Sequence, residues 1–435
     1  MFSLPDDCDS YVKIYRHRAE NQPEDLAYIF LEDGENKENK ITFGELHHQA
    51  LTVAAEIRSY IKEGDRALLV YQPGVEFIIT FTACIYAGVI AVPVFPPQNQ
   101  KDWPRFVKIV QDCRASLVCT AQSTFTMLEV AIKNTKKIAN VSCIATDIVP
   151  NKTVLNANNE NWVWPDSNLS TVMFLQYTSG STGDPKGVMV SHGNLLHNEH
   201  INVSGLGHGS DISLVNWCPQ YHDLGLIGNI LLVPYIGRKL VLMSPIAFLQ
   251  KPLRWLQAIS KYKATASGGP NFAYELCLRK IKDEDLAALD LSSWDLAYSG
   301  AEMIRPATLE RFYQRFKVCG FRKEAFRPVY GLAESTLIVT TSNGSKKYVS
   351  RYIDADALHL NKAIELDESN PKGRWLISCG QAVDQELQII NPNTLNTCSD
   401  NQVGEIWVKG KSVCQGYWNR PEVTKEIFQA YTADT

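Results

Sequence analysis

The sequence lacks the features that mark a disulfide-bonded, zinc-binding or secreted protein. Its cysteines form no C-x-x-C pair and no cluster with histidine, so neither a zinc site nor a disulfide framework is expected. The amino terminus has no basic start followed by an apolar run, which is the pattern of a signal peptide. We therefore expect a cytoplasmic protein with reduced thiols. The cysteines are Cys8, Cys84, Cys113, Cys119, Cys143, Cys218, Cys277, Cys319, Cys379, Cys398 and Cys414.

An excess of positive charge is also missing. The 43 basic residues are outnumbered by 47 acidic ones, which gives a formal net charge of -4. Nucleic-acid-binding proteins usually carry a basic surface, so no nucleic-acid partner is expected. With 435 residues and 45% hydrophobic residues, the composition is that of a soluble globular protein with several subdomains.

One uncharged stretch, from Phe77 to Pro97, is long enough to raise the question of a membrane span. Gly88 and Pro93 interrupt it, and the residues after Gly88 are β-branched. The pattern therefore predicts a buried helix over Val75 to Ala87 followed by a strand over Val89 to Phe95. We predict no membrane span here.

Helices and short apolar strands alternate along the first part of the chain. Strands are expected over Leu26 to Glu32 and Leu117 to Thr120. Thr42 and Glu45 have the spacing of a capping box, which predicts a helix from there to about Ile61. Such alternation predicts an α/β fold in which a largely parallel sheet carries helices on both faces.

A segment rich in hydroxyl groups and glycine, Tyr177-Thr-Ser-Gly-Ser-Thr-Gly-Asp-Pro-Lys-Gly-Val188, has the composition of a phosphate-binding loop. It places four hydroxyl residues, three glycines and one lysine within twelve positions. Glycines let backbone N–H groups turn toward an anion, hydroxyls add donors, and Lys186 adds a mobile positive charge. These are the requirements of a bound triphosphate.

The same segment does not match the P-loop. Pro185 precedes the lysine and lacks an N–H group, and Gly187 follows it where a P-loop has a hydroxyl residue. The flanking residues, 172–177 and 187–191, both have the pattern of strands, whereas a P-loop opens a helix. The alternative interpretation is a polar hairpin turn, which Gly-Asp-Pro would suit.

His222 follows the aromatic segment that begins at Trp217 and precedes an apolar helix with spaced glycines. Small residues on such a helix would leave room for a chain-like ligand, which favours a pocket wall. The alternative is a surface histidine beside Asp223 acting as a helix N-cap. The residues assigned to the substrate pocket are Trp217, His222, Gly225, Ile227 and Gly228.

Two later segments have features suited to a nucleotide. Leu296-Ala-Tyr-Ser-Gly-Ala-Glu302 ends a strand at Gly300, and ligands of open α/β sheets lie beyond the carboxyl ends of strands. In Pro328-Val-Tyr-Gly-Leu-Ala-Glu-Ser335, Tyr330 offers an aromatic face to a base and Glu334 offers an oxygen ligand for Mg²⁺. The alternative is a strand-to-turn tyrosine next to a solvated glutamate.

Together these segments resemble those of the adenylate-forming superfamily. Along essentially its whole length, the sequence is similar to those of the fatty acyl-AMP ligases within that superfamily. The resemblance implies two parallel-type sheets flanked by helices and a small β-rich subdomain. It also implies that ATP and Mg²⁺ bind, that Lys186, His222 and Glu334 act in catalysis, and that Glu334 ligates the metal. The implied nucleotide-binding residues are Thr178, Ser179, Gly180, Ser181, Thr182, Gly183, Lys186, Gly300, Ala301, Glu302, Tyr330, Gly331 and Ser335.

A departure from the family lies just before the glutamate. Many relatives have a hydroxyl residue there, whereas this chain has Ala333, which leaves Ser335 as a possible substitute. The core of the hypothesis is that the loop around Lys186 and the pair Tyr330 and Glu334 close on one nucleotide.

A polar segment from Ser342 to Arg374 is long for a connection, and long loops are usually functional or disordered. An insertion here resembles that of fatty acyl-AMP ligases, which implies transfer of a medium- or long-chain acyl group to an acyl carrier protein of a polyketide or peptide synthetase. The alternative is that the segment is a surface insertion without a function, since loops lengthen at little cost. The chain would then be a long-chain acyl-CoA synthetase.

The predicted division is a first α/β subdomain over 1–169, a second one over 170–340 with the phosphate loop, and the insertion with the β-rich subdomain over 341–435. Gly404 to Thr424 resembles the segment before the superfamily's hinge. The hinge and the mobile carboxyl-terminal domain are not in the sequence, so a fragment is expected that binds acyl-AMP and adenylates slowly. A non-catalytic nucleotide-binding module is the remaining alternative.

Overall fold

The computed structural model describes residues 4–5, 8–149, 162–178, 184–209, 211–342 and 348–433. The chain divides into two compact units built from non-consecutive segments. Unit 1 consists of Met1–Leu196, Trp217–Pro245 and Cys414–Thr424, and unit 2 of His197–Asn216, Ile246–Val413 and Lys425–Thr435. The subdomain boundaries predicted from sequence, after residues 169 and 340, divide the chain into consecutive segments. They stay a prediction.

Unit 1 is built around a six-stranded sheet with the order β6-β5-β3-β4-β7-β8. All neighbours pair in parallel except β7 and β8, which are antiparallel. The strands are β3 (Arg66–Val70), β4 (Ile90–Pro93), β5 (Leu117–Thr120), β6 (Ser142–Ala145), β7 (Val172–Thr178) and β8 (Lys186–Ser191). The largely parallel sheet predicted for this part of the chain is confirmed.

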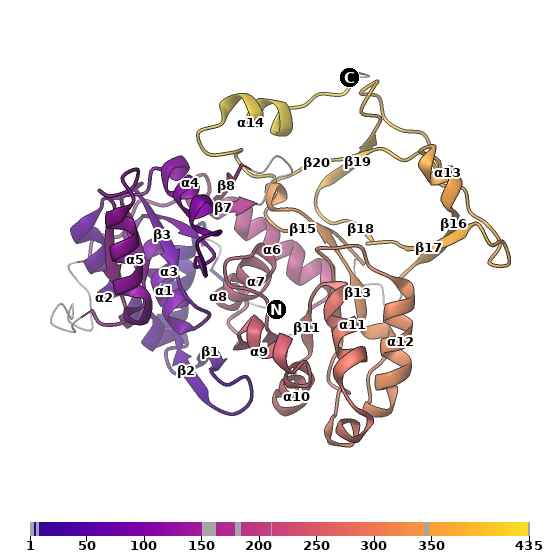
Figure 1. The fold of residues 1–435 in the computed structure, drawn as a ribbon, viewed down its shortest axis with the longest axis horizontal. Helices are drawn as coiled ribbons and strands as arrows, with labels where there is room; N and C mark the ends of the chain where they lie inside the picture. The colour runs from indigo at the N-terminus through magenta and orange to yellow at the C-terminus, as the bar shows by residue number, and fades with distance from the viewer. Residues whose placement is uncertain are drawn as a thin grey trace. The chain divides into compact units, whose positions relative to one another are not determined.

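Three further strands of unit 1 pair with one another. β1 (Leu26–Leu31) lies between β10 (Leu240–Met243), which is parallel to it, and β2 (Glu38–Thr42), which is antiparallel. The helices of unit 1 are α1 (Tyr11–Asn21), α2 (Phe43–Tyr60), α3 (Val75–Ala87), α4 (Trp103–Cys113), α5 (Gln122–Asn134), α7 (Asp223–Gly225), the π-helix η2 (Leu226–Leu231) and α8 (Leu232–Ile236). Figure 1 shows α2, α3 and α5 in the same part of the ribbon as β3.

Local sequence signals explain where these helices begin and end. Thr42 accepts a hydrogen bond from the Glu45 N–H group, and the Glu45 carboxylate accepts one from the Thr42 N–H group, which is the predicted capping box. α3 covers the predicted residues and ends at Gly88, whose φ of 67° is in the left-handed region. The uncharged stretch is therefore a buried helix followed by strand β4, as predicted. Among the described residues, no helix is long and apolar enough to cross a membrane.

Unit 2 contains a four-stranded parallel sheet with the order β13-β12-β11-β9. Its core is aromatic: Trp255, Trp294 and Phe312 are fully buried, and the rings of Trp255 and Trp294 lie 5.3 Å apart. The strands are β9 (Leu214–Asn216), β11 (Ala266–Gly268), β12 (Leu296–Ser299) and β13 (Phe326–Pro328). The surrounding helices are α9 (Pro245–Gln250), α10 (Leu253–Tyr262), α11 (Asn271–Lys280), η3 (Asp283–Ala288), α12 (Pro306–Phe316), η4 (Lys317–Cys319) and η5 (Lys323–Ala325). Three of the unit boundaries fall within helices, namely α6 (His192–Leu206), α9 and α14 (Pro421–Phe428).

The remainder of unit 2 is mostly antiparallel β-structure. β14 (Tyr330–Gly331), β15 (Ile338–Thr341) and β18 (Gln381–Ala382) form one small sheet, and β19 (Glu386–Ile390) pairs with β20 (Glu405–Lys409). The predicted insertion folds in its described part as a hairpin of β16 (Ser350–Asp354) and β17 (Gly373–Ile377) with the short helix α13 (Ala355–His359). The polar composition of this segment predicted a long loop, whereas in the structure its described part forms paired strands. The turn η6 (Ala333–Ser335) connects β14 and β15.

Candidate active site

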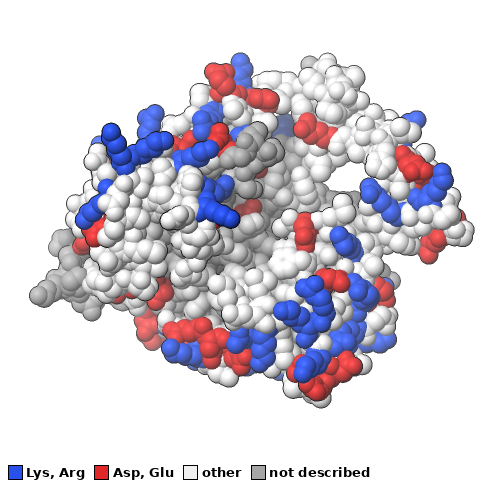
Figure 2. Space-filling model, in the orientation of Figure 1, with Lys and Arg blue, Asp and Glu red and all other residues white. Residues whose placement is uncertain are grey.

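The glycine-rich segment connects two strands, as the sequence predicted, and these strands pair antiparallel. Thr178 at the end of β7 pairs with Lys186 at the start of β8, so the loop begins and ends at adjacent backbone positions. Ser179, Gly180, Ser181, Thr182 and Gly183 lie outside the described residues. Around the loop's base, Arg105 Nη2 donates to the Thr178 carbonyl at 3.3 Å and Lys108 pairs with Asp184 at 2.7 Å. Figure 2 shows Lys and Arg side chains gathered over α4, which carries Arg105 and Lys108.

A polar junction at Asp112 supports the strand that leads into the loop. One carboxylate oxygen of Asp112 accepts a hydrogen bond from the Tyr177 hydroxyl at 2.6 Å, and the other pairs with Arg420 Nη2 at 2.7 Å. The Asp112 carbonyl also accepts from Asn419 Nδ2 at 3.0 Å. Burial, together with the neighbouring Cys113 and Asp112, raises the pKa of Tyr177 far above its usual value, so the phenol stays a proton donor. Sequence patterns gave no signal for this junction, because its members lie 65 and 308 positions apart.

Lys186 is placed by the segment that follows Cys414. Met189 N–H donates to the Gly416 carbonyl at 2.9 Å, and Trp418 N–H donates to the Gly187 carbonyl at 2.8 Å, so this segment lies along β8. The Lys186 ammonium group is 5.2 Å from the centre of the Tyr417 ring, which is within the range of a cation–π contact. The lysine is half-buried and begins the strand at the mouth of the loop.

His222 is the N-cap of α7, and its side chain is 51% exposed. Its Nδ1 lies 2.7 Å from Asp223 Oδ1 and 3.3 Å from the Leu224 N–H nitrogen. One nitrogen cannot both donate to the carboxylate and accept from the backbone. Leu224 N–H also reaches Asp223 Oδ1, at 2.6 Å, so Nδ1–H donates to Asp223 and the backbone group is satisfied by the same carboxylate. The predicted alternative placed the N-cap at Asp223, whereas the structure places it one residue earlier.

The Asp223 carboxylate raises the pKa of His222 above 6.5, and partial burial opposes this shift. The protonated ring is therefore favoured in the folded chain. The resulting stabilisation is fully present below the pKa of the unfolded chain and is lost as the pH rises through the folded pKa. We expect Asp223→Asn to lower the pKa of His222, measured from the ring Cε1–H chemical shift against pH.

Asp166→Asn, at an exposed carboxylate elsewhere in unit 1, is the matched control and should leave the His222 titration unchanged. An unchanged midpoint in Asp223→Asn would show that the ion pair does not determine the protonation state of the ring.

Three of the residues assigned to the acyl chain, Gly225, Ile227 and Gly228, follow His222 in α7 and η2, and Trp217 precedes it. Trp217 and Ile227 are buried, and Ile227 and Gly228 lie in the π-helix η2. A Cβ atom at Gly225 would lie 2.1 Å from the Pro219 carbonyl oxygen, so close backbone packing requires this glycine. Gly225 thus has a packing role that the sequence analysis did not give it. The role of Trp217, Gly225, Ile227 and Gly228 as an acyl-chain wall stays a prediction. π-helices are rare and often occur at functional sites, and the sequence pattern did not indicate this one.

In unit 2 the carboxyl ends of β12 and β13 lie side by side. Ser299 pairs with Pro328, and Val329 N–H donates to the Ser299 carbonyl at 2.8 Å. Gly300 and Tyr330 therefore follow adjacent parallel strands at the sheet edge where such folds bind ligands. The Ser299 hydroxyl is buried and has no hydrogen-bond partner among the described residues, a group that the sequence analysis did not single out.

The residues after Gly300 have different roles. Ala301 has a φ of 64°, a conformation that non-glycine residues adopt at a cost and that is frequent at functional sites. The Glu302 carboxylate accepts a hydrogen bond from the Phe272 N–H group at 2.6 Å and so caps the start of α11. Glu302 therefore has a structural partner, and its contact with a nucleotide stays a prediction.

Tyr330 begins β14, and Glu334 lies on the connection from β14 to β15. Burial and the negative charge of Glu334 raise the pKa of Tyr330. A Cβ atom at Gly331 would lie 1.7 Å from the Leu337 carbonyl oxygen, so this glycine lets the connection close on itself. Ala333 and Ser335 are buried, whereas Glu334 is half-buried.

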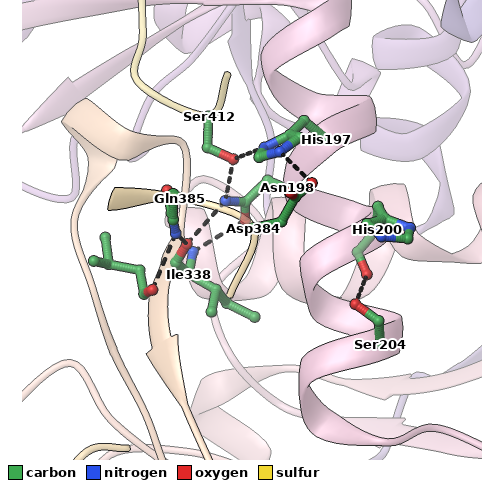
Figure 3. Close-up of polar contacts among 9 residues, drawn as sticks. His197, Asn198, His200, Ser204, Ile338, Asp384, Gln385 and Ser412 are labelled. Carbon is green, nitrogen blue, oxygen red and sulfur yellow. Dashed lines mark hydrogen bonds and ion pairs between the residues drawn. The ribbon is translucent and has the colours of Figure 1, made fainter. Parts of the chain in front are cut away.

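Residues far away in sequence hold this connection. Asn198 on α6 donates through Nδ2 to the Ile338 carbonyl at 3.0 Å and accepts through Oδ1 from the Ile338 N–H group at 3.0 Å (Figure 3). Gln385 Nε2 donates to the same carbonyl at 3.1 Å. Neither residue was predicted to belong to the site, because a single Asn or Gln carries no spacing signal.

Comparison with known proteins decides the family. The AMP-binding enzyme family matches residues 15–418. The chain belongs to this family. Over 98% of its length and 72% of the relative's, this AMP-binding enzyme is 39% identical to a medium-chain-fatty-acid–acyl-carrier-protein ligase of Moorena producens. It is also 36% identical to a putative fatty-acid–CoA ligase of Mycobacterium tuberculosis, over 97% of this chain and 73% of that relative.

The solved structures agree with this placement. A fatty acyl-adenylate ligase of Legionella pneumophila, solved in complex with acyl adenylate and pyrophosphate, is 41% identical over 96% of this chain and 72% of its own, with a TM-score of 0.88. The AMP-binding enzyme therefore has the fold of the large domain of fatty acyl-AMP ligases, and the predicted resemblance is confirmed. It is an acid-activating ligase.

Proposed function

We propose that this chain activates a medium- or long-chain fatty acid to its acyl-adenylate and passes the acyl group to an acyl carrier protein. A carboxylate oxygen attacks the α-phosphorus of ATP, the bond from that phosphorus to the bridging oxygen breaks, and pyrophosphate leaves. The observation that carries the proposal is the likeness along 96% of the chain to a fatty acyl-adenylate ligase that holds acyl adenylate and pyrophosphate.

Each described part of the proposed site supplies one need of this reaction. Lys186, at the mouth of the loop, neutralises charge on the β- and γ-phosphates, because phosphoryl-type transfer depends on positioning and electrostatics. Gly300, Ala301 and Tyr330 accept the adenine at the carboxyl ends of β12 and β13. His222, whose Nδ1 lies 2.7 Å from Asp223 Oδ1, faces the carboxylate end of the fatty acid.

Mg²⁺ would be held by Glu334. The described residues include no group of three or more His, Cys, Asp or Glu residues suited to a metal. Mg²⁺ usually takes one or two carboxylates and completes its coordination with substrate phosphates and water, so a single half-buried carboxylate fits. When bound, the ion neutralises phosphate charge. Glu334, on the connection from β14 to β15, would hold the ion in place.

An acyl carrier protein is proposed as the acceptor on two grounds. The relative from Moorena producens is named for transfer to such a carrier, and the β16–β17 hairpin occupies the position of the insertion predicted from sequence. The carrier would belong to a polyketide or peptide synthetase.

The test is a hydroxylamine-trapping assay with ATP and fatty acids of graded length. We expect acyl hydroxamate and an equal amount of pyrophosphate, both dependent on the fatty acid. Absence of hydroxamate at every chain length would overturn the proposal.

A second candidate, an acyl-CoA synthetase, is favoured by the name of the Mycobacterium tuberculosis relative. It shares the adenylation step, so the assay is repeated with CoA or with a purified acyl carrier protein in place of hydroxylamine. We expect acyl transfer to the carrier. A CoA thioester formed as fast as the acyl-adenylate would favour the second candidate.

A further inference from the structure

The connection that carries Glu334 contains a strained residue. Thr336 has a φ of 69° and a ψ of -67°, and Leu337 N–H donates to the Ser335 carbonyl at 2.8 Å, which together define the rare form of the γ-turn. A β-branched residue with positive φ is a clear conformational outlier. The turn begins at Ser335, one residue after Glu334, so its geometry determines the direction of the glutamate backbone. Such a conformation persists only where surrounding contacts impose it.

Asn198 supplies those contacts. Its side chain is buried, and Nδ2 lies 3.0 Å from the Ile338 carbonyl and 3.0 Å from Ser412 Oγ (Figure 3). Nδ2 also lies 3.3 Å from the Ser335 carbonyl. With Oδ1 accepting from Ile338 N–H, one amide contacts the first residue of the turn and the residue that follows it. Two N–H groups serve three acceptors, so the longest contact, to Ser335, shares a hydrogen.

A chain of hydrogen bonds fixes which way the Asn198 amide points. His197 Nε2 lies 3.0 Å from Asp384 Oδ2, which accepts only, so Nε2–H is the donor there. In the neutral ring Nδ1 then accepts from the Ser412 hydroxyl at 2.7 Å, and Ser412 Oγ is left to accept from Asn198. Ser412 acts on the turn directly as well, because its carbonyl accepts from the Thr336 hydroxyl at 2.7 Å.

We propose that Asn198, oriented by Ser412 and His197, is a positioning residue that holds the Thr336 turn in its strained form and thereby fixes the direction of the Glu334 carboxylate. The inference rests on the function proposed above, in which Glu334 binds Mg²⁺. All of these residues belong to unit 2.

Asn198→Ala removes the amide, and Ser412→Ala removes only the hydroxyl that orients it. The matched control is Ser204→Ala on the same helix, where the hydroxyl donates to the His200 carbonyl at an exposed position (Figure 3). The Mg²⁺ concentration for half-maximal pyrophosphate release should rise about tenfold in Asn198→Ala, the scale of losing a buried hydrogen-bond partner, and about threefold in Ser412→Ala. The fatty-acid KM should stay unchanged, and Ser204→Ala should resemble the unchanged chain.

A double-mutant cycle separates positioning from general loss of folding. With Glu334→Gln already present, Asn198→Ala should weaken binding of ATP in the presence of Mg²⁺ by less than about twofold, because an effect exerted through Glu334 is not additive. An Mg²⁺ dependence equal to that of Ser204→Ala, or additive losses in the cycle, would overturn the inference.

A readout independent of activity distinguishes failure of this inference from failure of the proposed function. In a crystal structure of nucleotide-free Asn198→Ala, Thr336 should leave the positive-φ region and the Glu334 carboxylate should move. A Thr336 turn that keeps its conformation would overturn the inference even if the unchanged chain forms acyl-adenylate. Absence of acyl-adenylate from the unchanged chain would instead overturn the proposed function.

Discussion

Replacing Glu334 with glutamine should lower the rate of acyl-adenylate formation by at least about 100-fold, the loss typical of removing one group that stabilises developing charge. The substitution keeps the shape of the side chain and removes its charge, so Mg²⁺ would lose its only proposed protein ligand. The half-buried position of Glu334 on the connection from β14 to β15 makes folding tolerant of the change. Pyrophosphate release at saturating ATP measures the effect.

Glu324→Gln is the matched control, because Glu324 is an exposed carboxylate of the same unit. It should leave the rate within about twofold, the scatter of surface substitutions. A second readout comes from Tyr330, whose pKa is raised by burial and by Glu334. Loss of the negative charge in Glu334→Gln should lower that pKa, seen in the ultraviolet absorbance of the phenolate. Full activity in Glu334→Gln would remove the metal site from the proposal.

Lys186→Met should reduce kcat by about 100-fold, because in the proposed reaction the ammonium group would neutralise negative charge that develops on the departing pyrophosphate. The apolar replacement retains the length of the side chain but loses the contact with Tyr417, a contribution of about 0.5–1 kcal/mol at an exposed site. Melting temperature should therefore change little while turnover falls. Single-turnover measurements with ATP and fatty acid separate the chemical step from product release.

The control is Lys133→Met, which breaks a surface ion pair with Glu129 on α5 and should leave kcat unchanged. If Lys186→Met retained more than about a third of the turnover, the loop around it would not be the phosphate site, since one such group normally contributes far more.

Local signals predicted much of unit 1. The capping box at Thr42 and Glu45, helix α3 and strand β5 match their predicted bounds, because hydrophobic period and cap residues act within a few positions. The strands on both sides of the glycine-rich segment were also predicted, whereas their antiparallel pairing was not.

The supports of the site could not be predicted in the same way. Asn198, Gln385 and Asp112 act through partners 46 to 308 positions away, and their residue types are unremarkable in isolation. Gly225 is a related case, since its spacing suggested a ligand and the structure adds close packing against the Pro219 carbonyl. Whether the loop around Lys186 and the pair of Tyr330 and Glu334 contact one nucleotide stays a prediction.

The placement of residues 415–418 beside β8 has a consequence for the solubility of shortened chains. β8 is the outermost strand of its sheet, and Gly416 and Trp418 form backbone hydrogen bonds along it. Ending the chain before Cys414 would leave those N–H and C=O groups open to pairing with another molecule, the usual origin of edge-to-edge aggregation. A shortened chain that lacks the residues from Cys414 onward would therefore self-associate, even though the sheet itself is intact.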